Sequence, residues 1–192
     1  MKNPTTRERT RIDVEQFARM GEAGVFPPDA RIELLDGELL NMPRIGTPHA
    51  WAVSELARQF TLAAQHVDHY VSVQNPLILS RFSEPLPDVM LVRGPALTYA
   101  RRKPEPLDVL VLIEVADSTV GFDRQRKVPL YARGFVAEVW LLDLDARRLE
   151  VHTRPGRDGY ALRRTPAAGE LIAPEGAPDV AVDWVRALGP GD

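Results

Sequence analysis

Two acidic residues stand where the sequence predicts buried strands. Glu114 lies near the end of LDVLVLIEVA, a β-branched and aliphatic run typical of a strand buried on both faces. A carboxylate in such a place must be neutralised by a proton, a cationic side chain or a metal ion. Asp88 opens the preceding predicted strand, LPDVMLV. If the two strands pair antiparallel, the carboxylates lie together and suit a hard cation such as Mg²⁺ or Mn²⁺. The alternative is that both acids merely cap loops.

A lysine in the next predicted helix is the third candidate. Lys127 shares a helical stripe with Leu130 and Tyr131, which look core-facing, so its ammonium could reach the carboxylates. There it would position water and offset charge on a phosphate. The simpler alternative is a helix-surface ion pair with Asp123, worth roughly 0.3–0.5 kcal/mol.

Three further polar residues are weaker candidates. His49 opens a long predicted helix, where it would contact a phosphate or serve a structural role. Glu33 alternates with apolar neighbours in a predicted hairpin and is either a third carboxylate or part of a solvent-facing side. Gln74 precedes a predicted strand break, where it joins the site or satisfies backbone groups.

The elements that must position these residues follow from periodicity and turn signals. We expect a short helix over VEQFARM that begins at Asp13 and ends at Gly21, and a hairpin that turns at Asp36-Gly37. A helix with Thr47 as its N-cap is expected to run to about His66. Strands are expected over HYVSVQ, PLILS, LPDVMLV and 109–116, and a helix over about 123–133, kinked or begun late at Pro129.

A C-terminal meander completes the predicted pattern. AEVWLLDL, ARRLEVHT and YALRRTP are expected to form three strands, followed by a last strand and a terminal helical turn in PDVAVDWVRALG. The interleaved helices and strands predict an α/β (α+β) fold with a mixed sheet flanked by helices. Residues 1–10 are predicted to be a flexible arm, and residues 11–192 a single domain.

Composition excludes several classes of protein. The 192 residues include no cysteine, which rules out a disulfide framework or a thiolate site and suits a cytoplasmic location. We expect no signal peptide and no membrane span. A net charge of −3 gives no global sign of nucleic-acid binding. The chain has no zinc spacing, dinucleotide fingerprint, P-loop or serine-hydrolase elbow.

Taken together, these segments resemble a known family, the Uma-type putative restriction endonucleases of the PD-(D/E)XK nuclease superfamily, formerly a domain of unknown function. The resemblance covers roughly residues 31–185 and rests on the order and spacing of RIELLDGELLNMPRIGTPHA, VQNPLILS, EPLPDVMLVR, LIEVADSTVGFDRQRKVPLYARG and AEVWLLDL. It implies that Asp88, after Pro87, is the aspartate of the PD motif and that Glu114 is the acid of the (D/E)XK motif. Ala116 stands where that motif has lysine, and Lys127 is the best replacement.

The resemblance implies a divalent-metal-dependent endonuclease that hydrolyses phosphodiester bonds of DNA, double-stranded by expectation. Asp88, Glu114 and the carbonyl of Val115 would hold Mg²⁺ or Mn²⁺, and Glu33, His49 and Gln74 form a second tier of site residues. Candidate contacts to the DNA backbone are Arg101, Arg102, Lys103, Arg124 and Arg126, whose alternative is a solvated basic surface. A homodimer is expected by analogy with nucleases that cut both strands. The rival functions are a non-catalytic binding module on a nuclease fold, and a nuclease for RNA or branched structures.

Overall fold

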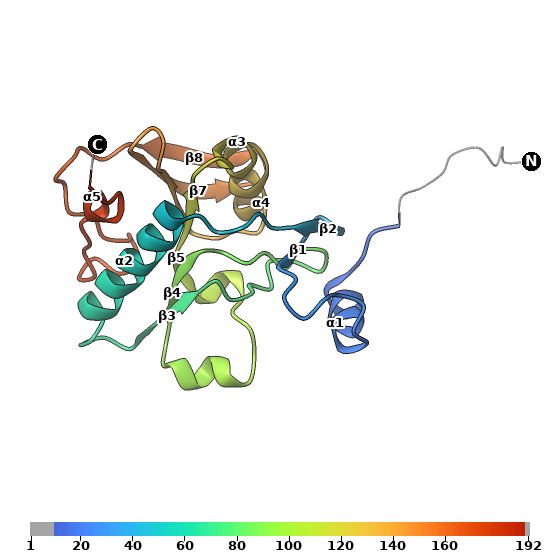
Figure 1. The fold of residues 1–192 in the computed structure, drawn as a ribbon. Coiled ribbons are helices and arrows are strands. Elements are labelled where there is room, and N and C mark those ends of the chain that lie inside the picture. The colour runs from blue at the N-terminus through green and yellow to red at the C-terminus, as the bar shows by residue number, and fades with distance from the viewer. Residues whose placement is uncertain (1–9, 191–192) are drawn as a thin grey trace, which may run out of the picture.

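A computed structural model of the protein describes residues 10–190 (Figure 1). All but the last residue of the predicted N-terminal arm, 1–10, therefore lies outside the described residues. Helix α1 (Val14–Glu22) begins at Asp13 as predicted. The Asp13 carboxylate accepts a hydrogen bond from the Gln16 amide, and the Gln16 side chain accepts one from the Asp13 amide. This reciprocal pair satisfies amide groups that the helix itself leaves unpaired.

The predicted hairpin forms a small sheet of its own. Strands β1 (Ile32–Leu35) and β2 (Glu38–Asn41) pair antiparallel around Asp36 and Gly37. Both turn residues have positive φ, 52° and 85°, which is the backbone conformation that an Asp-Gly turn supplies. The hairpin meets the rest of the chain through a β-bridge between Leu34 and Glu84.

The main sheet has six strands whose spatial order is the order of the chain. Only β5 and β6 are parallel, so the predicted mixed sheet and C-terminal meander are both confirmed. The strands are β3 (His69–Val73), β4 (Val89–Arg93), β5 (Val109–Ala116), β6 (Glu138–Asp143), β7 (Arg148–Gly156) and β8 (Gly159–Arg164).

Helices cover both faces of this sheet (Figure 1). On one face, α2 (Thr47–Ala63) and α5 (Trp184–Ala187) pack over a core that includes Phe60 and Trp140. The N-cap of α2 is Gly46, one residue before the predicted one. On the other face, the helical segment between β5 and β6 covers a second core that contains Tyr131. Every residue of β5 is buried, as its apolar run predicts.

The helical segment between β5 and β6 has three parts. A short α3 (Val120–Phe122) leads into a π-helical turn (Asp123–Lys127), and α4 (Val128–Arg133) follows. The Val128 amide donates to the carbonyl of Asp123, five residues back. The α-helix proper therefore begins late, with Pro129 in its first turn, and it ends at Gly134 as predicted.

Two predicted strands are wrong. The PLILS segment is extended, but its amides bond to different parts of the chain. The Leu77 amide donates to Pro85 and that of Ile78 to Pro104, so no ladder forms with one neighbour. In the C-terminal segment, Val182 makes only an isolated bridge with Ile172. The predicted loop before β5 contains two 3₁₀ turns, Ala96–Ala100 and Pro106–Asp108. Within residues 10–190, no helix has the length and apolar character needed to cross a membrane.

Candidate functional site

Asp88 and Glu114 lie next to each other at the ends of β4 and β5. The two strands pair antiparallel with Val89 opposite Ile113, which meets the condition set by the sequence analysis and places the acids one step further along. Asp88 Oδ2 accepts a hydrogen bond of 3.0 Å from the Val115 amide. The residues are 4% and 3% exposed, so both carboxylates are held inside the protein.

Asp88 also contacts two of the second-tier residues. His49 Nε2 lies 3.2 Å from Oδ2, and the Gln74 side-chain amide donates to Oδ1 at 3.1 Å. Burial alone would raise the pKa of the Asp88 carboxyl. The His49 ring, the Val115 amide and the Gln74 amide outweigh burial and lower that pKa below its usual value. Asp88 is therefore ionised at neutral pH.

Lys127 is buried between two carboxylates. Its Nζ atom lies 2.8 Å from Glu114 Oε1 and 3.0 Å from Glu33 Oε1. The helix-surface alternative is wrong, since Lys127 is only 3% exposed. Burial would lower the pKa of the ammonium, but the charges of Glu114, Glu33 and Asp123 raise it above its usual value. Lys127 therefore carries a fixed positive charge and cannot serve as a general base.

Glu114 has a second partner that sequence reasoning missed. The Tyr131 hydroxyl donates a short hydrogen bond of 2.5 Å to Glu114 Oε1. Burial raises the pKa of the Glu114 carboxyl well above its usual value; Lys127 opposes that shift, whereas Asp88 adds to it. Burial and the charge of Glu114 also raise the pKa of the Tyr131 phenol, which keeps it a donor. Its position on the apolar stripe with Lys127 was the only sequence signal for this role.

Asp123 and Glu33 add two more acids around Lys127. Asp123 is buried and accepts a hydrogen bond of 2.7 Å from the Thr119 hydroxyl. Burial raises the pKa of its carboxyl, against the opposing effect of Lys127. Glu33 reaches the site from the hairpin and accepts a hydrogen bond of 2.8 Å from the Leu86 amide. Its side chain therefore points into the protein, and the solvent-facing alternative for Glu33 is wrong.

Six of these side chains, the floor residues Glu33, His49, Asp88, Glu114, Asp123 and Lys127, line a pocket of about 250 Å³. Within residues 10–190, no group of three or more His, Cys, Asp or Glu side chains is arranged to hold a metal ion. The charges nonetheless favour a divalent cation, because Lys127 is surrounded by carboxylates and the acids raise one another's pKa. Mg²⁺ takes few protein ligands and fills the remaining positions with water. Asp88 and Glu114 supply two adjacent carboxylates, which is the kind of ligand that this ion takes.

Four of the five cations predicted to contact DNA are ion-paired. Arg102 bonds Asp108 with both of its terminal nitrogens, and Lys103 bonds Glu84. These two line a second pocket with Arg101, which is exposed, and none of the floor residues lines that pocket. Arg126 pairs with Glu38 and Arg124 with Asp143 and Glu150. A role in DNA binding stays a prediction for all five.

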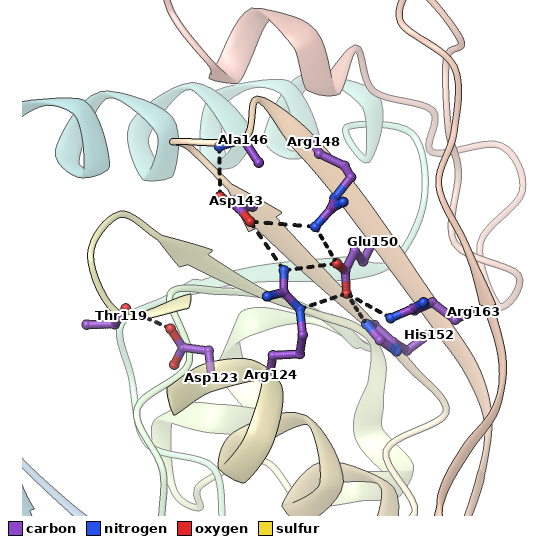
Figure 2. Close-up of polar contacts among 9 residues, drawn as sticks. All are labelled: Thr119, Asp123, Arg124, Asp143, Ala146, Arg148, Glu150, His152 and Arg163. Carbon is purple, nitrogen blue, oxygen red and sulfur yellow. Dashed lines mark hydrogen bonds and ion pairs between the residues drawn. The ribbon is translucent and has the colours of Figure 1, made fainter. Parts of the chain in front are cut away.

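Arg124 belongs to a charge network beside the pocket, drawn in Figure 2. Its guanidinium lies 3.2 Å from Asp143 Oδ2 on β6 and 3.0 Å from Glu150 Oε1 on β7. Both acids are buried, and Glu150 is also approached by Arg148 and His152. Because Arg124 follows Asp123 in the π-helical turn, this network ties that turn to two strands of the sheet (Figure 2).

Comparison with known proteins gives a family and a shared fold. Residues 14–185 match the model of a family described as "Putative restriction endonuclease". The structure also resembles the crystal structure of a putative nuclease from Anabaena variabilis ATCC 29413, with a TM-score of 0.68 and 14% sequence identity. The match covers 92% of this chain and 99% of the other, and at this identity it shows a shared fold. No curated protein matches the chain.

Proposed function

The chain belongs to the Uma2 family of putative restriction endonucleases, and from that premise we propose that it is a divalent-metal-dependent endonuclease that hydrolyses phosphodiester bonds of DNA. One observation carries the proposal beyond the family. Asp88 and Glu114 are adjacent on two paired strands, with the Lys127 ammonium 2.8 Å from Glu114. Two carboxylates and a buried cation are the groups that metal-assisted phosphodiester hydrolysis needs.

The protein's own residues would divide the work as follows. Asp88 and Glu114 would hold Mg²⁺ or Mn²⁺, with the Val115 carbonyl as a further ligand; the ion supplies activation of water and stabilisation of the leaving oxygen. His49 and Gln74 hold the Asp88 carboxylate in place. Lys127 keeps its proton and offsets negative charge on the phosphate. Lys127 thus takes the role of the motif lysine, whose place in the sequence is occupied by Ala116.

A plasmid assay tests this function. Purified protein is incubated with supercoiled plasmid in Mn²⁺, in Mg²⁺ and in EDTA, alongside Glu114→Gln. Glu55→Gln is a matched control, because Glu55 is also buried but pairs with Arg58 on α2, outside the pocket. We expect metal-dependent nicking by the wild type and the control, and none by Glu114→Gln. Equal nicking by Glu114→Gln would remove Glu114 from the site.

The missing motif lysine favours a second candidate, a nucleic-acid- or protein-binding module without catalysis. Ala116 occupies the expected lysine position and is fully buried in β5. A protein that binds DNA but nicks plasmid in no metal would support this alternative. The homodimer also stays a proposal. Sedimentation of the protein with and without duplex DNA tests the homodimer.

A further inference from the structure

The depth of the proposed catalytic groups limits what can reach them. The side chains of Asp88, Glu114 and Lys127 are each about 5% exposed or less and lie on the floor of the pocket. A scissile phosphate must therefore enter the pocket. A paired base is stacked inside the duplex and cannot follow the phosphate into this pocket. A base that does enter the pocket must therefore be unpaired.

Apolar side chains also line the pocket, beside polar ones such as Asp117 and Ser118. Phe122, at the end of α3, and Ile45, before α2, are 40% and 41% exposed and both line the pocket. Leu40, Met42 and Pro43 extend this surface along the chain that follows β2. Neither a metal ion nor a phosphate is stabilised by contact with apolar side chains. A nucleotide base does, because its flat face stacks on aromatic and aliphatic side chains once it is unpaired.

Two arginines at the same pocket complete the pattern. Arg31 precedes β1, and Arg44 lies in the segment between β2 and α2. Within residues 10–190 neither guanidinium forms an ion pair, in contrast to Arg102, Arg124 and Arg126. Their charge is therefore available to phosphates on either side of a nucleotide in the pocket.

We propose that this pocket takes one unpaired nucleotide, with its base against Phe122 and Ile45 and its neighbouring phosphates near Arg31 and Arg44. The inference rests on the proposed nuclease function and narrows its substrate to single-stranded, frayed or flap DNA in place of uninterrupted duplex. Supercoiled plasmid is still cut, because negative supercoiling transiently separates its strands.

Binding is measured by fluorescence anisotropy with Ca²⁺ in place of Mg²⁺. The probes are a labelled single strand of fifteen nucleotides, the same strand with abasic central positions, and the corresponding duplex. We expect the single strand to bind about tenfold more tightly than the duplex, and base removal to weaken binding about tenfold. In Phe122→Ala, both the preference for the single strand over the duplex and the effect of base removal should disappear. Phe135→Ala is the matched control, because Phe135 is an exposed phenylalanine outside the pocket.

The outcomes separate this inference from the proposed function. Equal affinity for strand and duplex, unchanged in Phe122→Ala, would overturn the inference even if plasmid is nicked. Strand preference that depends on Phe122 would support it, even if no metal supports cleavage and the nuclease function fails. Ile45→Ser provides a second variant at an exposed position, and its affinity for the single strand should fall in the same direction.

Discussion

At the scale of single residues, the site is a buried cluster in which acidic side chains outnumber basic ones. Lys127 is the only Lys or Arg side chain that pairs with Glu33 or Glu114 within the described part of the chain. Removing one member of a buried pair leaves the other charge uncompensated, which is the costly way to alter such a cluster. Lys127 therefore supports the fold as well as the proposed chemistry.

This reasoning predicts the effect of Lys127→Met on stability. We expect the free energy of unfolding to fall by about 3 kcal/mol or more, because Glu33 and Glu114 lose their buried partner. Urea denaturation at pH 8 measures it. Arg133→Met is the control, since its ion pair with Asp36 is half-exposed and should be worth under about 1 kcal/mol. Equal small losses in both variants would contradict a central role for Lys127.

The raised pKa of Glu114 predicts a pH dependence. Stability contributed by this carboxyl is fully present below its ordinary pKa of 4.5 and is lost as the pH rises through the higher value in the folded protein. Glu114→Gln cannot ionise, so it avoids that loss. In EDTA, the stability of the variant relative to the wild type should therefore increase from pH 5 to pH 8. Parallel stability curves in urea denaturation would show that the shift is absent.

At the scale of elements, the π-helical turn is the decisive feature. It turns both Asp123 and Lys127 into the protein, while Arg124 between them reaches Asp143 and Glu150 on the sheet. Wide turns of this kind are often found at functional sites. The turn is held from the side by the network of Figure 2, outside the pocket itself.

Arg124→Met tests whether this network positions the turn. We expect a loss of about 2 kcal/mol in the free energy of unfolding, because two buried carboxylates lose a partner. We also expect a slower nicking rate with little change in the salt dependence of DNA binding. Arg126→Met, in the same turn but with an exposed pair, should leave stability nearly unchanged. If only Arg126→Met reduces the salt dependence of DNA binding, Arg126 contacts DNA and Arg124 does not. If Arg124→Met reduces it too, Arg124 also binds a phosphate.

Sequence patterns predicted elements better than they predicted contacts. Alternation and the Asp36-Gly37 turn gave the hairpin, and the apolar run to Ala116 gave the central strand. The PLILS segment alternates like a strand because Leu77 and Leu79 are buried, yet no single neighbour pairs with it. Periodicity predicts which side chains are buried, but it does not predict which backbone segment pairs with the strand.

The site shows the same limit. From the sequence, Asp88 and Glu114 lie together only if their two strands pair antiparallel, and the structure shows that they do. The π-helical turn could not be predicted from the sequence, since α-helical spacing alone gives no sign of an i to i+5 hydrogen bond. The sequence therefore left a surface pair between Asp123 and Lys127 open as an alternative, and it gave no sign of the bond from Tyr131 to Glu114.

At the scale of the whole molecule, the site joins two separate sheets. Glu33 comes from the small hairpin, whereas Asp88 and Glu114 come from the six-stranded sheet. The Glu33 carboxylate accepts hydrogen bonds from Lys127 and from the Leu86 amide, so it helps to hold the hairpin in place. Glu33 therefore links the hairpin to the buried lysine of the proposed site.

Glu33→Gln should loosen that attachment. We expect faster hydrogen–deuterium exchange in β1 and β2, because the charge-assisted bond to Lys127 is lost. Exchange in β7 and β8, which contain none of these contacts, serves as the internal control. Mass spectrometry of peptides measures both. Uniformly faster exchange would indicate a general loss of stability instead, and unchanged exchange would show that other contacts hold the hairpin.

The order of the main sheet has a consequence for how the protein is made. Its strands pair in the order of synthesis, so the sheet can grow as the chain emerges. The π-helical turn, however, is anchored by Asp143 and Glu150, which are translated after Lys127. An unfinished chain, or a fragment cut before β6, lacks these anchors. We therefore expect the proposed site to be complete only once translation has passed β7, and a fragment that ends before β6 to leave plasmid uncut.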